Sequence, residues 1–312
     1  MNRRRVFSLL FAVILALTLS VSALADPASQ PVVSRAGITA YGPLTEYAPV
    51  GDPAWGASKP AFETSWPGWP SIDGAVWIGT ATNTEYMAPD SWRWFHDEVV
   101  VACTAYDIED TSISLTADNA EEFYFNGQLV GTDGILQGSF VDDVNIWLSV
   151  IEHPISPQPG TNTLDFIIRN YGSRPTSNPT GLIYRSDFNY QLPGVSWTAP
   201  SGAQPLLVEA GANLRIRFQL TGQGGVMLRT FQPVVLKIHG PSTSTEVGPV
   251  VAQWDPSSTT SGLKFNTINS MYTTVFQTRK YNLVPEDYTI IVHDECSDEV
   301  LGMYKITIVP AQ

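Results

Sequence analysis

The sequence predicts an all-β protein built from two β-sandwiches. Short segments alternate apolar and polar residues with period two, and turn residues separate these segments. The chain has 24 Gly and 23 Pro in 312 residues, and only 15% of it is charged. Since a domain has roughly 150 residues, this length predicts two domains.

The composition also excludes several classes of protein. With 43% hydrophobic and 11% aromatic residues, the chain can build a core, which excludes intrinsic disorder. The Gly and Pro content argues against a helical bundle. A net charge of -13 with only five Lys argues against a nucleic-acid partner, because phosphate binding needs a basic surface.

Residues 1–25 have the pattern of a secretory signal. Arg3 to Arg5 precede the apolar run Val6 to Val21, and Ala23-Leu24-Ala25 predicts cleavage after Ala25. An uncleaved anchor is the alternative, since the run is nearly long enough to span a bilayer. Later stretches are too short for a membrane span. We therefore expect a secreted, extracellular protein, whose charge becomes -16 when three Arg leave with the signal.

The first half contains a strand pattern and a hairpin signal. Residues 111–117 alternate cleanly, as do residues 164–169. Asn126-Gly127 suits the positive φ angles of a type I′ turn, so residues 123–131 are predicted to form a β-hairpin. These segments predict a first all-β domain over residues 33–191.

The second half repeats this pattern after a break. Residues 192–204 have linker composition, rich in Pro, Gly and Ser. Alternation resumes at Leu214, Ile216 and Phe218, and residues 288–308 predict a terminal hairpin. About seven short strands in about 105 residues predict a smaller β-sandwich over residues 205–310.

Six segments of the first half carry a family resemblance: Ala75-Val76-Trp77-Ile78, residues 91–95, Thr116-Ala117-Asp118-Asn119, residues 123–127, residues 160–164 and residues 178–182. In this order they resemble the galactose-binding-like jelly-roll domains of bacterial extracellular proteins. The resemblance implies a jelly-roll β-sandwich that recognises a ligand, with carbohydrate as the expected class.

Three segments of the second half, residues 209–220, 261–265 and 272–278, carry another resemblance. They resemble the PxKF domain, an immunoglobulin-like β-sandwich without catalytic residues. Arg215 replaces the family's Pro, Arg217 its Lys and Phe276 its Trp, and residues 294–298 replace the Asp-Gly turn of its last hairpin. The apolar face is retained, so the resemblance implies a spacer or interaction domain.

The two cysteines, Cys103 and Cys296, are 193 positions apart and lie in different predicted domains. Cys103 follows an apolar strand and is expected to be buried, whereas Cys296 lies in a polar turn and is expected to be exposed. A disulfide between the two domains is the alternative, and the sequence leaves it open.

The sequence lacks the common catalytic and metal-binding motifs. H-E-x-x-H, C-x-x-C, G-x-S-x-G and a phosphate loop are absent, and the four His are dispersed. We therefore predict that the protein is not an enzyme and needs no cofactor. A hydrolase with an unusual site is the last alternative.

Two sets of residues are candidate binding sites. Trp66 and Trp69 in a Pro/Gly loop, together with Trp92, are predicted to stack on sugar rings; the alternative is that they pack against the sandwich. Asp107, Glu109 and Asp110 offer oxygen ligands for a structural Ca²⁺, or else form a solvated turn. The pairs Asp118-Asn119 and Asp142-Asp143 allow the same two interpretations.

These observations predict an exported, non-catalytic protein that acts by binding or display at the cell exterior. The first sandwich would bind carbohydrate, so the expected partner is an extracellular glycan. The alternative is a structural or adhesive surface protein that works through contacts with another surface protein.

Overall fold

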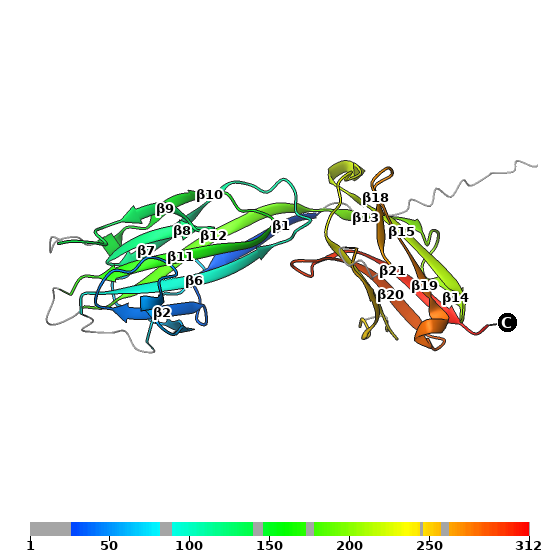
Figure 1. Ribbon diagram of the computed structural model, residues 1–312, viewed down its shortest axis with the longest axis horizontal. Helices are drawn as coiled ribbons and strands as arrows, with labels where there is room; N and C mark the ends of the chain where they lie inside the picture. The colour runs from blue at the N-terminus through cyan, green and yellow to red at the C-terminus, as the bar shows by residue number, and fades with distance from the viewer. Residues whose placement is uncertain are drawn as a thin grey trace, which may run out of the picture.

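A computed structural model describes residues 26–81, 89–139, 146–172, 178–243, 246–256 and 262–311. The chain forms two elongated lobes that follow one another in sequence (Figure 1). In the described residues, regular structure consists of β-strands and four short 3-10 turns. The predicted all-β fold is therefore confirmed. The predicted signal and the pair Asp142-Asp143 lie outside the described residues.

The first lobe contains twelve described strands and two 3-10 turns. They are β1 (Asp26–Val33), β2 (Thr39–Leu44), η1 (Pro53–Trp55), β3 (Lys59–Pro60), β4 (Phe62–Glu63), β5 (Ile78–Gly79), β6 (Ser91–Val101), β7 (Thr111–Asp118), β8 (Ala120–Phe125), β9 (Gln128–Asp133), η2 (Ile146–Leu148), β10 (Ile151–Ile155), β11 (Gly160–Asn170) and β12 (Gly181–Leu192).

These strands form two facing sheets. One has the order β10-β7-β12-β5-β4, with β1 also paired to β12, and the other has the order β3-β2-β6-β11-β8-β9. The inward side chains of both sheets make one core, which includes Phe95, Phe166 and Tyr184. This arrangement is a β-sandwich, whose core is made by the inward-facing alternate residues of both sheets.

The second lobe has the same construction on a smaller scale. Its elements are β13 (Gly194–Ala199), β14 (Leu206–Glu209), β15 (Asn213–Thr221), η3 (Gln223–Gly225), β16 (Val234–His239), β17 (Val250–Trp254), β18 (Lys264–Asn266), β19 (Met271–Gln277), η4 (Thr278–Tyr281), β20 (Asp287–Asp294) and β21 (Val300–Val309). The sheets β13-β15-β19-β18 and β14-β21-β20-β16-β17 enclose a second core around Phe218, Tyr272 and Ile290.

Local sequence signals place several of these turns correctly. Asn126 and Gly127 have φ angles of 50° and 75°, and they join β8 to β9 as the predicted hairpin. The predicted terminal hairpin is the antiparallel pair of β20 and β21. The segment predicted as a linker, residues 192–204, contains β13, which pairs with β15 and so belongs to the second sandwich.

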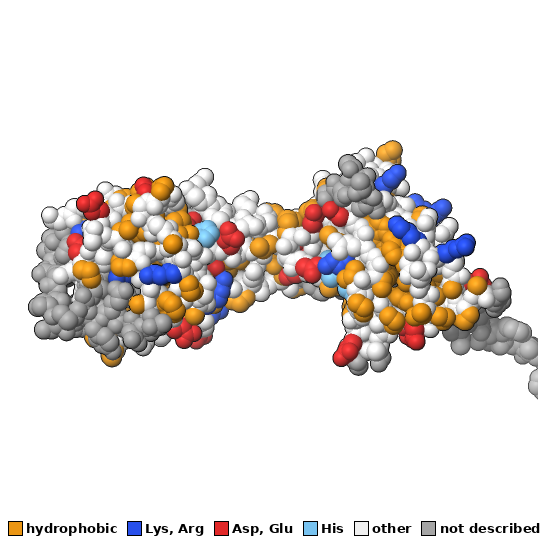
Figure 2. Space-filling view, turned by 60° about the horizontal axis from the view of Figure 1, so that its bottom comes forward, with side chains coloured by type: hydrophobic (Ala, Val, Ile, Leu, Met, Phe, Trp, Pro, Cys, Tyr) orange, Lys and Arg blue, Asp and Glu red, His pale blue; other side chains and the backbone are white. Residues whose placement is uncertain are grey.

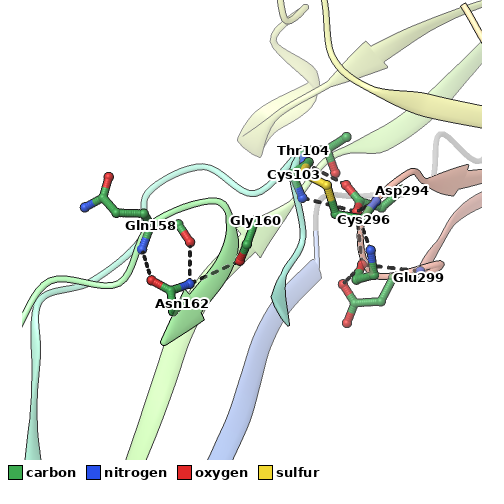
Figure 3. The surroundings of a disulfide bond; sticks show 9 residues. Cys103, Thr104, Gln158, Gly160, Asn162, Asp294, Cys296 and Glu299 are labelled. Atoms are coloured by element: carbon green, nitrogen blue, oxygen red, sulfur yellow. Dashed lines mark hydrogen bonds between the residues drawn. A yellow bond between two sulfur atoms is a disulfide. The ribbon is translucent and has the colours of Figure 1, made fainter. Parts of the chain in front are cut away.

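The two sandwiches are joined by a disulfide between Cys103 and Cys296 (Figure 3). Cys103 follows β6 in the first sandwich, and Cys296 lies in the turn between β20 and β21 in the second; their Cα atoms are 5.5 Å apart. The alternative of an interdomain disulfide, which the sequence left open, is therefore the one that this structure adopts. Leu192 packs against both cores at the same junction.

Asp294 binds both sides of this junction (Figure 3). Its carboxylate accepts hydrogen bonds from the backbone N–H groups of Cys103 at 3.1 Å and Thr104 at 2.7 Å in the first sandwich. Within its own turn it accepts hydrogen bonds from the N–H groups of Cys296 and Ser297, both at 2.9 Å, and from the Ser297 hydroxyl at 3.1 Å. Asp294 is 1% exposed, so this hub is buried.

Glu121 of β8 is a carboxyl group buried in the first sandwich. It is 1% exposed, and its Oε1 has no hydrogen-bond partner among the described residues. Burial, and then the charge of Asp133 on the paired strand, raise the pKa of Glu121 to about 8. The folded state therefore holds a proton that the unfolded state releases above its pKa of about 4.5. Stability should fall as the pH rises from about 4.5 to about 8.

We expect Glu121→Gln to remove this dependence. At about pH 8 the free energy of unfolding of the variant should exceed that of the wild type by roughly 4 kcal/mol. At about pH 4.5 the two free energies of unfolding should be nearly equal. Urea unfolding at both ends of the window measures the difference. Glu152→Gln, at an exposed position of β10, is the control and should follow the wild type. Parallel pH curves for Glu121→Gln and wild type would contradict the assignment.

Candidate functional site

The Trp pair in the Pro/Gly loop is engaged by the first sandwich. Trp69 stacks on Trp77 with ring centroids 4.1 Å apart, and its indole N–H donates to Asp118 at 2.9 Å. Gly181 leaves room for it, because a Cβ there would lie 2.9 Å from the Trp69 ring. Trp66 is half-buried in the same loop. One face of the Trp69 ring is thus covered by protein, as the packing alternative expects.

Trp92 lies in the interior, which differs from the predicted role in ligand binding. It is 7% exposed, and its indole N–H donates to the carbonyl oxygen of Leu136 at 2.8 Å. The Arg169 guanidinium covers the ring at 4.6 Å from its centroid. The loop before β3 and the segment after β9 close over this end of the sheet. A ligand in solvent therefore has little access to Trp92.

The predicted Ca²⁺ ligands Asp107, Glu109 and Asp110 are all exposed in the loop between β6 and β7. In the described part of the chain, one group of three possible metal ligands lies within 4.8 Å of one another: Cys103, Asp294 and Cys296. None of the three predicted acids belongs to a group of this kind among the described residues. The two sulfurs of that group are bonded to each other, so neither is a thiolate ligand. Asp118 accepts the Trp69 N–H instead.

A different group of residues comes together on the outer face of the sheet that contains β6. The inward residues of β6 are Phe95, Asp97 and Val99, so the alternate residues point outward. Strand register aligns them with outward residues of β2, β11 and β8 in two rows. The first row runs Tyr41, Trp94, Ile167, Glu122 and the second runs Thr39, His96, Asp165, Tyr124. We call Tyr41, Trp94, His96, Glu122, Tyr124 and Asp165 the Trp94 face.

Asp165 organises the centre of the Trp94 face. Its Oδ1 accepts the indole N–H of Trp94 at 2.8 Å and contacts His96 Nδ1 at 2.8 Å. Trp94 also stacks on Tyr41, with centroids 4.1 Å apart and planes 11° apart. One residue thus fixes an aromatic ring and an imidazole on neighbouring strands.

Glu122 organises the adjoining part of the face. Its Oε2 accepts hydrogen bonds from the hydroxyl groups of Tyr124 and of Tyr47, which lies in the loop after β2, each at 2.9 Å. Burial and the contact with this carboxylate raise the pKa values of both tyrosines, so both remain neutral donors. All three side chains are half-buried, which leaves part of each ring and carboxylate at the surface.

His96 joins the face to its neighbour Glu98. Burial lowers the pKa of His96, but hydrogen bonds to Asp165 and Glu98 and their charges outweigh burial and raise it above 6.5. Glu98 in turn lines a cleft of about 600 Å³ between the sandwiches, together with Arg35, Tyr190 and Glu299. The Trp94 face therefore leads towards the junction.

The period-two pattern of β6 is the only trace of this face in the sequence. Alternation puts Trp92 and Trp94 on one side of β6, and both pack against one small cluster of buried residues, but Trp92 is 7% exposed whereas Trp94 is only half-buried. The partners of Trp94 lie 53 residues before it and 71 residues after it. Only strand pairing brings them together.

The chain is similar to solved structures in fold only. No family model matches the chain, and no curated protein matches it. Among solved structures, a β-glucuronidase from Ruminococcus gnavus is similar at 12% identity and a TM-score of 0.27, over 90% of this chain and 45% of that one. β-Glucuronidases from an uncultured Clostridium sp. and from Faecalibacterium prausnitzii are each 10% identical, with TM-scores of 0.27, over 90% of this chain and 45% and 46% of theirs.

These matches correct one prediction. The sequence predicts a protein that is not an enzyme, but the matched structures are enzymes, which contradicts that prediction. The chain spans less than half the length of these proteins. With TM-scores near 0.27, the likeness assigns no activity or site to this chain.

Proposed function

We propose that the chain is an exported protein that acts by binding or display at the cell exterior, and that its first sandwich binds carbohydrate through the Trp94 face. In the described residues, no helix has the length and apolarity needed to cross a membrane. The Cys103–Cys296 disulfide agrees with an oxidising compartment outside the cytoplasm.

The network around Asp165 carries this proposal. Sugar sites combine apolar ring surface, which contacts the C–H face of the sugar, with fixed polar groups that bind its hydroxyls. The face has both, since Tyr41, Trp94 and Tyr124 are half-buried and adjoin the half-buried carboxylate of Glu122, which two tyrosines hold. Asp165, which is 4% exposed, fixes Trp94 and His96. Such prior fixing lowers the entropy cost of binding.

A glycan array followed by calorimetry on the chain from Asp26 onward tests the proposal. We expect at least one polysaccharide to bind, and Trp94→Ala to weaken that binding about tenfold or more, equivalent to roughly 1.4 kcal/mol. Tyr124→Phe, which removes only the hydroxyl that Glu122 accepts, should have a smaller effect. Circular dichroism and the unfolding midpoint verify that each variant is folded.

The variant Trp66→Ala distinguishes binding at the Trp94 face from binding at the Pro/Gly loop, because Trp66 is half-buried in that loop and lies outside the Trp94 face. It should leave the affinity nearly unchanged. If Trp66→Ala abolished binding and Trp94→Ala did not, the site would be the loop. If no glycan bound at all, the carbohydrate proposal would fail.

A second candidate function is contact with another protein through the second sandwich. Exposed apolar side chains gather at one end of it: Val226, Met227, Phe231 and Ile268, of which Ile268 is 95% exposed. These residues lie in the loop between η3 and β16 and in the loop between β18 and β19. Gln219 contacts both loops, because its amide N–H group donates to Met227 Sδ at 3.2 Å and to the Asn269 carbonyl at 2.8 Å. Hydrophobic side chains also gather on the visible face of the second sandwich (Figure 2), and exposed apolar surface favours protein contacts. A negative glycan test would leave this structural or adhesive role as the better hypothesis.

A further inference from the structure

The Trp94 face is acidic as well as aromatic. Glu98, Glu122 and Asp165 point outward from β6, β8 and β11. The outward residues of these strands include one basic side chain, Arg169, in the described part of the chain. Arg169 lies over Trp92 and pairs with Asp90 at 2.8 Å, so its charge is already matched.

Neutral or weakly basic groups, rather than Lys or Arg, hold these carboxylates. Glu122 accepts two phenol hydroxyls, both on Oε2, and Asp165 accepts an indole N–H and contacts an imidazole, both on Oδ1. The second oxygen of the half-buried Glu122, Oε1, accepts no hydrogen bond from the residues that the structure describes, whereas Asp165 is 4% exposed. Even with His96 protonated, carboxylates outnumber cations on the face.

The geometry points to an oligosaccharide of 2-amino sugars as the ligand of the Trp94 face, a deduction that rests on the proposed carbohydrate binding. Protonated amines would pair with the half-buried Glu122 and the exposed Glu98, while the sugar rings lie on the aromatic side chains. Asp165 is 4% exposed, so its part is to hold Trp94 and His96 in place. The face spans four strands, about 14 Å, so it exceeds a single sugar ring. Glu98 extends it into the cleft at the junction.

The same charges act against acidic sugars. A uronate carboxylate on this face would lie beside at least one protein carboxylate, and like charges at that separation repel strongly where water is partly excluded. We therefore expect amino sugars to bind best, N-acetylated sugars less well, and uronates not at all.

Calorimetry on the chain from Asp26 onward tests this order with three hexamers: glucosamine, N-acetylglucosamine and galacturonate, at mildly acidic pH. The glucosamine hexamer should bind at least about tenfold tighter than the acetylated hexamer, and raising the salt from about 0.02 to about 0.2 M should narrow the gap. Glu122→Gln should reduce the preference to about threefold or less. Glu152→Gln removes an exposed acid of β10, away from the face, and should leave the preference intact.

The outcomes separate the two proposals. If no hexamer bound and the glycan array were also negative, carbohydrate binding itself would fail. If the acetylated or acidic hexamer bound as tightly as glucosamine, carbohydrate binding would stand and the amino-sugar assignment would be wrong. An unchanged preference in a folded Glu122→Gln variant would also overturn it.

Discussion

Replacing Asp294 with Ala should lower the free energy of unfolding by about 3 kcal/mol or more. The substitution removes the acceptor of five hydrogen bonds, and the N–H groups of Cys103 and Thr104 would lose their partner at a buried junction. A buried donor without a partner costs roughly 1–3 kcal/mol. Asp294→Asn should have an intermediate effect, because its NH₂ group would face a donor N–H.

The measurement is urea unfolding of the full chain from Asp26 onward. Asp298→Asn is the matched control in the same turn: Asp298 is largely exposed and pairs with Lys237, so its loss should cost less than about 1 kcal/mol. Equal effects of Asp294→Ala and Asp298→Asn would show that the buried hub adds nothing to stability.

Removing the disulfide with Cys103→Ser and Cys296→Ser together should have the other large effect. The bond joins residues 193 positions apart, so it restricts a long loop of the unfolded chain. The chain-entropy model gives roughly 5 kcal/mol for a loop of this length. The variant should also sample a wider range of angles between the sandwiches, since their remaining direct links include Leu192 packing and the Asp294 hydrogen bonds.

Thermal unfolding and small-angle scattering with and without a thiol reductant measure these effects. The reductant should lower the melting temperature and raise the radius of gyration of the wild type, and leave the double Ser variant unchanged. Asp294→Ala should lower the free energy of unfolding less in reduced protein than in oxidised protein, because the disulfide and the Asp294 hydrogen bonds hold the same junction. A wild type indifferent to reductant would contradict the assigned role.

The sequence alone was sufficient for the fold class and for the local turns. Alternation of apolar residues needs only neighbours along one strand, and Asn126-Gly127 forms its turn through its own backbone preferences. Composition was less informative at residues 192–204, because Pro, Gly and Ser are common in turns as well as in linkers. β13 forms there because β15 offers it a partner edge.

The candidate site depended on tertiary structure. Alternation puts Trp92 and Trp94 on one side of β6, but Trp92 is the more buried of the two because Leu136 and Arg169, which are distant in sequence, contact it. The partners of Trp94 are set by the register of β2 and β11. Likewise, no local pattern could pair Cys103 with Cys296. Short-range backbone preferences thus determined the strands and turns, whereas packing between distant segments decided the face, the hub and the disulfide.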